Sequence, residues 1–392
     1  MPRLLYTYLI NQVLAPFYAS LIIITSILFL SRLIPILDII LAYNISLADF
    51  IRLYAYFTPQ LLIFALPMSS MMAMILGITH LNNEKELMVL KASGISLYRM
   101  LPPVLLFALV TALLTGLCSI YLIPSGKKAK VELAYQLAKE KFEKSLHEKR
   151  FSESIGDIVL YADHIDKRTG TWRGVYISDI RDAEHPVTII AENGKIAADA
   201  SAGILDISLN NGVLNRETSS SSQTIDFASY DMHLPLETPR KNPLAKLDET
   251  TMLQSELLSE VARLGRNNPA SILYLNEYHK RLALPVSCFI LTLLGFPLGF
   301  LSGPRHKTIG IPFGLIIFML FYVLLLASDI LSESLILPPA AAMWMPNLIF
   351  LLLTALLFNS VARETYTLYL EKLYDISYAV KSSLPWRKRR LQ

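Results

Sequence analysis

The chain has 392 residues, of which 53% are hydrophobic and 17% are charged, and its formal net charge is +4. Soluble globular proteins have about 25% charged residues, and the mean hydropathy of this chain is +0.43. A composition this apolar excludes a soluble enzyme, a nucleic-acid-binding domain and a disordered scaffold. We therefore expect a membrane protein.

Six long runs of the sequence contain no Lys, Arg, Asp or Glu, and together they hold 159 residues. A helix that crosses the hydrocarbon core of a bilayer needs about 20 such residues, and every run is long enough. The strands of an outer-membrane barrel are about 10 residues long and alternate in polarity, so a barrel is excluded. The six predicted spans are Leu4–Ser31, Leu53–Asn83, Met100–Gly126, Leu282–Pro304, Thr308–Ser328 and Ser334–Ala362.

The short loops differ in their content of Lys and Arg, and basic loops stay in the cytoplasm. Thirteen basic residues precede span one, lie between spans two and three or spans four and five, or follow span six, whereas the opposite loops contain only Arg32 and Arg52. Both termini are therefore predicted to be cytoplasmic. Span one has no small-residue cleavage site after a short apolar core, so we interpret it as a retained helix rather than a signal peptide.

The loop between spans two and three contains the sequence NNEKELMVLKASGIS at 82–96. Asn83 is placed to cap a helix, with Glu86 three residues later as in a capping box, and Gly94 is placed to end the helix in a left-handed conformation. The spacing predicts a short amphipathic helix over about 84–93 on the cytoplasmic face. Such a helix either docks into a groove of a partner or connects two spans along the membrane surface, and spacing alone leaves both open.

A polar insert at 127–281 separates spans three and four, and it holds 21 of the 36 basic and 23 of the 32 acidic residues. It opens with a helical pattern at 128–146, and a second helical stretch at 247–264 leads back towards span four. Asn193-Gly194 and Asn211-Gly212 are hairpin signals. Short strands without helical interruption predict an antiparallel sandwich or roll, whose inner face is either a closed core or a cradle for a lipid chain. The predicted strands are 157–165, 172–180, 187–193, 195–200, 203–211 and 223–234.

The sequence shows no catalytic cluster and no metal-binding cluster. His164, His185 and His233 lie on separate strands or turns of the insert, and we interpret them as solvated or structural. Cys118 and Cys288 lie inside spans and are interpreted as packing residues. The motif Gly-x-x-x-x-Gly-Lys-Ser/Thr is absent, so neither a P-loop nucleotide site nor a cofactor is expected.

Charged residues are absent from the span interiors, which argues against an ion-coupled carrier. Cations lie instead at the predicted non-cytoplasmic boundary, at Arg32, Arg52, Lys280 and Arg281. They are candidates for binding the phosphates of lipid headgroups. The alternative is that they snorkel to the membrane surface without a specific ligand.

Three segments of the chain carry a resemblance that covers nearly its whole length. They are EKELMVLKASG (84–94), EYHKRLALPVSCFILTLLGFPLGFLSGPRHKTIGI (277–311) and AMWMPNLIF (342–350). Together with three spans, an insert and three further spans, they resemble the LptF/LptG family, the permeases of the lipopolysaccharide-export ABC transporter. The segments around Arg281, Pro297, Arg305 and 344–347 look more like the F type than the G type.

The resemblance implies a membrane α-helical bundle of six transmembrane helices, with a periplasmic antiparallel β-jellyroll domain between the third and the fourth. The domains would be 1–126 with spans one to three and the coupling helix, 127–270 with the jellyroll and flanking helices, 271–362 with spans four to six, and 363–392 as a basic cytoplasmic tail. The protein would reside in the bacterial inner membrane.

The resemblance also implies the function and the partners. The chain would be the permease subunit of an ATP-driven transporter that extracts lipopolysaccharide from the outer leaflet of the inner membrane and passes it to a periplasmic bridge of jellyrolls. It would pair with an LptG-type permease, a cytoplasmic LptB-type ATPase dimer and an LptC-type periplasmic protein, and it would bind no nucleic acid.

Site residues follow from the same resemblance. The ATPase-coupling residues would be Glu84, Glu86, Leu87, Leu90 and Gly94. The lipopolysaccharide-binding residues would be Arg32, Arg52, Lys280 and Arg281. The F type carries a second cation one turn after Arg32, where this chain has Pro35.

Two alternatives remain open at this point. A lipoprotein-release or MacB-like ABC permease usually has four spans with a large insert after the first, which disagrees with six spans and an insert after the third. A non-transporting, membrane-anchored periplasmic scaffold or sensor predicts no ATPase partner and a dispensable helix at 84–93.

Overall fold

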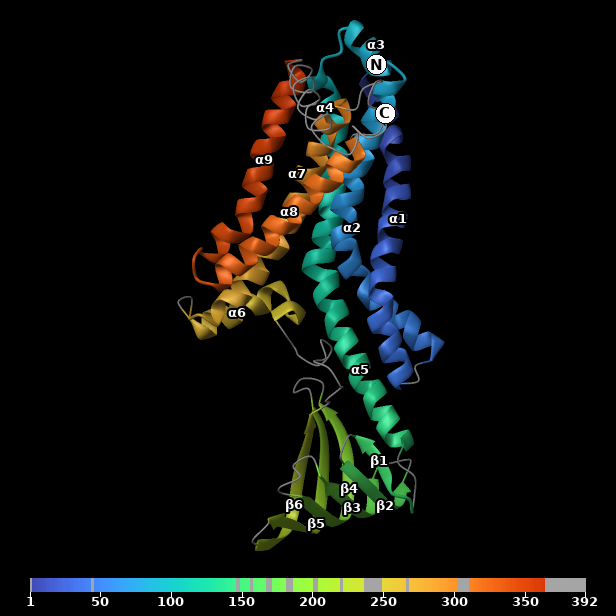
Figure 1. Cartoon of the computed structure of the whole chain (residues 1–392), viewed down its shortest axis with the longest axis vertical. Helices are drawn as coiled ribbons and strands as arrows, with labels where there is room; N and C mark the ends of the chain where they lie inside the picture. Colours follow the sequence, from blue (N-terminus) through green and yellow to red (C-terminus); the bar gives the residue numbers. More distant parts are fainter. Residues whose placement is uncertain are drawn as a thin grey trace, which may run out of the picture. The chain divides into compact units, whose positions relative to one another are not determined.

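The structure is a computed structural model, shown in Figure 1. It describes residues 2–43, 46–145, 149–155, 158–166, 171–180, 186–199, 204–218, 221–235, 249–265, 268–301 and 310–363. The expected tail at 363–392 and His185 thus lie almost entirely outside the described residues. The chain forms two compact units. The first comprises Met1–Leu33, Thr58–Pro124 and Met252–Gln392, and the second comprises Ile34–Phe57 and Ser125–Thr251.

Six helical segments of the described chain are long and apolar enough to cross a membrane, as the sequence predicted. They bury very different amounts of surface inside the chain. In the most apolar window of span one 17% of the residues are buried, whereas the corresponding windows of spans two and four are 72% buried. The spans lie in α1 (Pro2–Tyr43), α2 (Leu47–Asn83), α4 (Leu97–Leu117) with its continuation, α7 (Ser271–Leu301), α8 (Gly310–Glu333) and α9 (Pro339–Ala362).

The third span continues past α4 through a π-helical turn, Cys118–Leu122, into α5 (Ile123–Ser145). Pro124 follows that turn, and proline has no N–H with which to continue the i→i−4 ladder. The local change of register lets the helix run on without a break. The helix predicted at 128–146 is therefore the outer part of the third span.

Spans two and four pack against each other through glycines. A Cβ atom on Gly295 would lie 2.7 Å from the carbonyl oxygen of Met71, and one on Gly299 would lie 2.5 Å from Cβ of Ile78. Small residues at helix contacts allow backbones to approach closely in membranes, where burial of apolar side chains supplies little driving force. These contacts make α2 and α7 the centre of the bundle.

The insert contains one antiparallel sheet of six strands in the order β1-β2-β3-β4-β5-β6, each paired with its neighbour in sequence. Alternate residues face a core that includes Leu160, Trp172, Ile177, Ile207 and Leu209, all at most 2% exposed. The helical bundle with a β domain inserted between spans three and four is confirmed, and among the described strands the connection is a meander. The strands are β1 (Ser152–Ile155), β2 (Ile158–Asp166), β3 (Thr171–Asp179), β4 (Val187–Asp199), β5 (Ile204–Thr218) and β6 (Ser221–Pro235).

The two predicted Asn-Gly hairpins are wrong. Asn193-Gly194 lies inside β4 and Asn211-Gly212 lies inside β5, and the two strands pair along their length. A Cβ on Gly212 would lie 2.3 Å from the carbonyl oxygen of Ile190. The glycine therefore permits a close approach of two long strands and does not form a turn.

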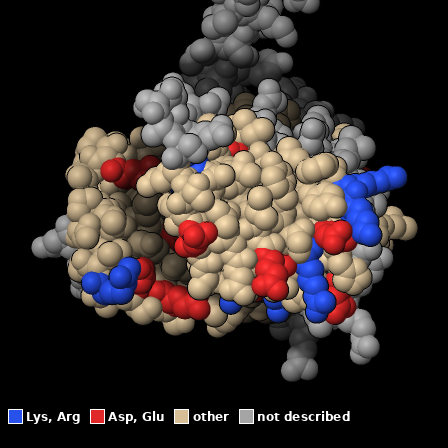
Figure 2. All heavy atoms as spheres, turned by 90° about the horizontal axis from the view of Figure 1, so that it is seen from below, with Lys and Arg blue, Asp and Glu red and all other residues tan. Residues whose placement is uncertain are grey.

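Acidic and basic side chains lie near one another on the face seen in Figure 2, without an extended patch of one sign.

Candidate functional site

The loop between spans two and three forms α3 (Glu86–Ala92), which corresponds to the helix predicted over 84–93. Its start differs from the prediction. Lys85 is the N-cap with φ of 61°, no side chain caps the helix, and the buried Oδ1 of Asn83 has no partner. The expected capping box between Asn83 and Glu86 is therefore wrong.

The end of α3 agrees with the prediction. Gly94 has φ of 76°. Its N–H donates to the carbonyl of Lys91 at 3.0 Å, and the N–H of Ile95 donates to the carbonyl of Leu90 at 3.1 Å. This pair of hydrogen bonds is a Schellman motif, which fixes the direction in which the chain leaves α3 and enters α4.

The apolar residues of α3 divide into two sets. Leu87 is 3% exposed and lies in the core of the bundle, and Leu90 packs partly buried against the same core. Met88 and Val89 are 68% and 63% exposed. Leu87 and Leu90, which were expected to contact a partner, instead attach α3 to its own bundle. Met88 and Val89 form the side of α3 that faces outwards.

The two acidic residues of this segment also differ. Glu86 is half-buried, and its Oε2 accepts a hydrogen bond of 2.5 Å from the hydroxyl of Tyr8 in α1. Glu84 is exposed. The carboxylate that sequence reasoning favoured for contact with a partner thus connects α3 to the first span.

Two of the four candidate lipid-binding cations are exposed. Arg32 in α1 has no described ion pair and faces outwards. Arg52 in α2 is 65% exposed, and its Nη1 lies 3.5 Å from Oδ1 of Asp49 one turn earlier. Exposed pairs of this kind contribute about 0 to 1 kcal/mol, so both guanidinium groups are accessible to an anion.

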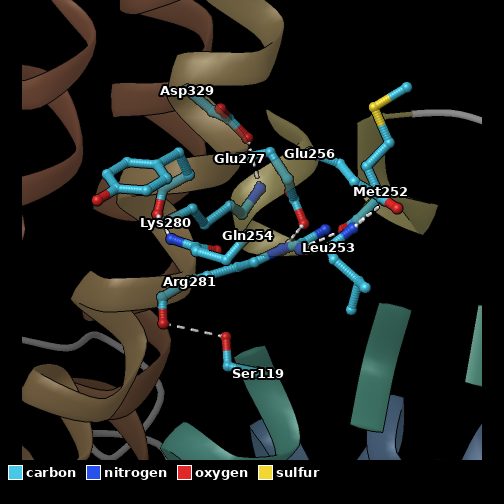
Figure 3. A network of polar contacts seen from close by, with 10 residues as sticks. Ser119, Met252, Leu253, Gln254, Glu256, Glu277, Lys280, Arg281 and Asp329 are labelled. Atoms are coloured by element: carbon cyan, nitrogen blue, oxygen red, sulfur yellow. Dashed lines mark hydrogen bonds and ion pairs between the residues drawn. The ribbon is translucent and has the colours of Figure 1, made fainter. Parts of the chain in front are cut away.

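Arg281 occupies a different environment, shown in Figure 3. It is 2% exposed. Its Nε donates to Oε1 of Glu277 at 2.8 Å, its Nη1 donates to the carbonyl of Met252 at 2.6 Å, and its own carbonyl accepts from the hydroxyl of Ser119 at 3.1 Å. The side chain joins α7 to the segment that enters α6 (Gln254–Leu264). It is not accessible to a lipid phosphate in this structure.

Lys280 points to another helix. Its Nζ donates to Oδ2 of Asp329 in α8 at 2.6 Å, and the two side chains are 30% and 23% exposed (Figure 3). One turn away the hydroxyl of Ser332 donates to Oδ1 of Asn276 at 2.6 Å. Lys280 and Arg281 therefore join α7 to α8 and to α6 respectively, and no group of three metal-binding side chains occurs among the residues that the structure describes.

Comparison with known proteins identifies the family. The family model for lipopolysaccharide export system permease LptF/LptG matches residues 7–360. This chain belongs to the LptF/LptG family. Among its relatives are an uncharacterised protein of Rickettsia prowazekii, 25% identical over 76% of this chain and 82% of its own length, and the lipopolysaccharide export system permease protein LptF of Escherichia coli K12, 20% identical over 89% and 93%. The LptF protein of Shigella flexneri matches to the same extent.

Membership of the LptF/LptG family makes the chain a lipopolysaccharide export permease and an integral protein of the inner membrane. The family model covers both types, so the F type stays a prediction. Lys280 and Arg281, which are neighbours in α7, both belong to the polar network of Figure 3. Arg32 lies in the first compact unit and Arg52 in the second.

The sequence did not reveal the hydrogen-bond partners of Glu86 and Lys280, nor which apolar residues of α3 are exposed. Tyr8 and Asp329 bind Glu86 and Lys280, yet each lies far from its partner in sequence. Met88 and Val89 belong to the motif that was singled out, but a helix this short does not reveal which residues face its own bundle. The outward side of α3 becomes visible only when the neighbouring spans are in place.

Proposed function

We propose that this chain is the permease subunit of an ATP-driven transporter that extracts lipopolysaccharide from the outer leaflet of the inner membrane. It works beside a second permease of the LptG type and receives energy from an LptB-type ATPase dimer in the cytoplasm. The lipid then passes to a bridge of periplasmic jellyrolls that leads toward the outer membrane and begins with an LptC-type protein. The match of the family model over nearly the whole chain supports the transporter class.

Energetics require a separate ATPase. Withdrawing acyl chains from a bilayer costs about 0.8 kcal/mol for each CH₂ group, and a lipid with several acyl chains does not leave spontaneously. The sequence contains no P-loop motif. The energy of hydrolysis must therefore reach this chain through a contact surface.

The observation that carries this proposal is the division of α3 into an attached and an outward side. Leu87 lies in the bundle core, while Met88 and Val89 are exposed beside the exposed carboxylate of Glu84. Exposed apolar residues next to a charge are typical of an amphipathic helix that fits a groove on a partner. Since Leu87 and the Tyr8–Glu86 hydrogen bond attach α3 to the bundle, a push on Met88 and Val89 moves the first span as well.

A pull-down tests this contact directly. We expect Met88→Glu together with Val89→Glu to remove the ATPase subunit from the complex purified with the full chain, while the chain itself remains folded. Leu335→Glu is the matched control, because Leu335 is 64% exposed on the turn between α8 and α9. Retention of the ATPase by the double variant, with normal export, overturns the coupling role and favours the scaffold alternative.

Lipid contact is proposed for Arg32 and Arg52, whose guanidinium groups are exposed. A photo-crosslinking residue at position 32 is expected to capture lipopolysaccharide in cells. The same residue at position 281 should capture none, because Arg281 is buried among protein partners. Failure of position 32 to capture lipid, with export intact, removes Arg32 from the lipid path.

The orientation is also part of the proposal. The unequal distribution of Lys and Arg supports cytoplasmic termini and a periplasmic β domain. The F type is supported by the named LptF relatives and by the segments around Arg281 and Pro297. A tag after residue 363 that a protease reaches only from the cytoplasmic side is the expected result, and cleavage from the periplasmic side contradicts this orientation.

A further inference from the structure

A groove of about 330 Å³ lies between α4, α7 and α9, and none of its lining residues belongs to α3 or to the charge network around Arg281. Its wall is apolar and includes Leu101, Leu293, Phe296, Leu351, Ala355 and Phe358. A water molecule takes about 30 Å³ and needs two to four polar partners, so this wall offers too few polar atoms to retain a column of water. The groove is shaped for a flexible apolar chain.

The lining changes in polarity along the groove. Tyr98 lies at one end, 63% exposed, with its ring centroid 5.5 Å from that of Phe358. Asn359 joins the lining at the same end, while Phe296 and Phe358 stack at 6.1 Å deeper inside. Aromatic side chains with a polar tip favour the level of lipid headgroups, so Tyr98 marks where the groove reaches the membrane surface.

Two exposed cations adjoin this end. Arg99 follows Tyr98 in α4, and Arg363 ends α9, where its N–H donates to the carbonyl of Asn359 at 3.0 Å. Neither guanidinium has a carboxylate partner within the described part of the chain. Figure 1 shows that the start of α4 and the end of α9 lie at the end of the bundle that carries α3.

We propose that the groove binds one acyl chain of an anionic phospholipid from the leaflet on the α3 side of the membrane. The acyl chain lies against Leu293, Phe296 and Ala355, and the phosphate meets Arg99 and Arg363. The order of the site, from apolar wall to Tyr98 and Asn359 and then to two cations, matches the order of acyl chain, ester and phosphate in such a lipid. This lipid is distinct from the exported one, because it enters from the opposite leaflet.

Charge complementarity decides the choice of occupant. A Lys or Arg side chain near an anionic membrane surface contributes about 1 kcal/mol to lipid binding. Residues 364–392 of this chain carry six basic and three acidic residues, so this segment has the same net sign of charge as Arg99 and Arg363. An anionic phospholipid complements both the apolar wall and the two positive charges.

The site also adjoins the coupling loop. Leu97, one residue before Tyr98, packs in the same core cluster as Leu87 of α3. The first turn of α4 is therefore shared by the groove and by the helix that we propose as the ATPase contact. An acyl chain between α4 and α9 holds that turn in place, but binding of the lipid itself does not depend on the proposed function.

The test uses the full chain in nanodiscs of phosphatidylethanolamine that contain phosphatidylglycerol with a photoactivatable diazirine in its acyl chain. We expect crosslinks to concentrate at 98–104, 293–296 and 351–359. Ala355→Trp fills the groove and should reduce these crosslinks at least fivefold. Leu352→Trp is the matched control on α9, because Leu352 is 65% exposed and does not line the groove.

The headgroup is tested separately. Arg99→Gln and Arg363→Gln should each lower the crosslinking of phosphatidylglycerol about fivefold, which corresponds to about 1 kcal/mol, and should leave that of a phosphatidylcholine probe unchanged. Crosslinks spread evenly over the exposed faces of α1 and α8, or unaffected by Ala355→Trp, overturn the site. Crosslinks from 364–392 into the groove that replace those of the lipid identify the tail as the occupant and overturn the proposal as well.

Discussion

The two ends of the helical bundle treat the residues at their membrane boundary differently. At one end α3 turns Met88 and Val89 outwards and attaches through Leu87. At the other end Arg281 turns inwards, and Lys280 is held by Asp329. Apolar residues are thus left available at one end, and charges are satisfied internally at the other. The comparison shows that a position at the membrane boundary does not reveal whether a residue binds within its own chain or remains exposed to a partner or a lipid.

Substitution of Arg281 is expected to change the stability of the chain more than the other substitutions considered below. Arg281→Met removes a buried guanidinium and leaves the half-buried carboxylate of Glu277 and the carbonyl of Met252 without these hydrogen bonds. Removing one member of a buried ion pair costs about 3 to 5 kcal/mol, so the midpoint of thermal unfolding in detergent should fall by many degrees. Arg263→Met is the control, because the side chain of Arg263 is 69% exposed and its loss should leave the unfolding midpoint nearly unchanged. Equal midpoints for the two variants would mean that Arg281 is not structural.

The next effect separates the two sides of α3. Leu87→Ala empties a position that is 3% exposed and should destabilise the chain by about 3 kcal/mol. Met88→Ala should change the free energy of unfolding by less than about 0.5 kcal/mol, yet weaken retention of the ATPase. Denaturant unfolding and a pull-down measure the two properties. If both variants behave alike in both measurements, the division of α3 is wrong.

A smaller effect is expected where the pair is partly exposed. Asp329→Asn removes the charge that faces Lys280 and should cost about 1 kcal/mol. The freed lysine should also react faster with an acylating reagent, which peptide mass spectrometry detects. Glu333→Gln, an exposed acidic residue one turn later on α8, should leave the reactivity of Lys280 unchanged. An unreactive Lys280 in Asp329→Asn would show that another group holds it.

The smallest effect is expected in α6, at the surface. The guanidinium of Arg263 donates to the carboxylate of Glu260 and lowers the pKa of that carboxyl group below its usual value. Because the pKa is lowered on folding, the contribution is present above the unfolded value of about 4.3 and is lost as the pH falls through the folded value. Melting curves of Glu260→Gln should therefore differ slightly from those of the wild type near pH 7, and the difference should shrink as the solution is acidified. A difference that grows in acid contradicts this sign.

The sequence predicted the features that depend on long stretches of one composition. Six uncharged runs became six spans, and the polar segment between the third and the fourth became a β domain. The end of α3 was also predicted, since glycine at position 94 favours a left-handed residue wherever the helix lies. The spans are predictable because every one of them must match the same apolar bilayer. The end of α3 is predictable because it depends on the backbone preference of a single glycine.

The failures arose where a distant segment decides the outcome. Asn211-Gly212 favours a tight turn locally, but pairing with β4 extends β5 through it, and Nδ2 of Asn211 bonds Glu192 of that strand at 3.3 Å. Arg281 looked like a lipid contact until Met252, 29 residues earlier, supplied its acceptor. The sequence shows that a cation lies at the membrane boundary, but only the fold determines which acceptor binds it.

The small internal burial of α1 has a consequence for biogenesis. This helix is made before the other five spans, yet Ile22, Ile23, Ile27 and Leu30 are all more than half exposed, so the described chain covers little of its apolar surface. Its contacts include a core cluster shared with α2 and the hydrogen bond from the hydroxyl of Tyr8 to Glu86 of α3, and both of these partner helices are synthesised later. Of the six spans, the one that is synthesised before the others thus completes its packing late, and contact with lipid must hold it in the membrane until its partner helices are made.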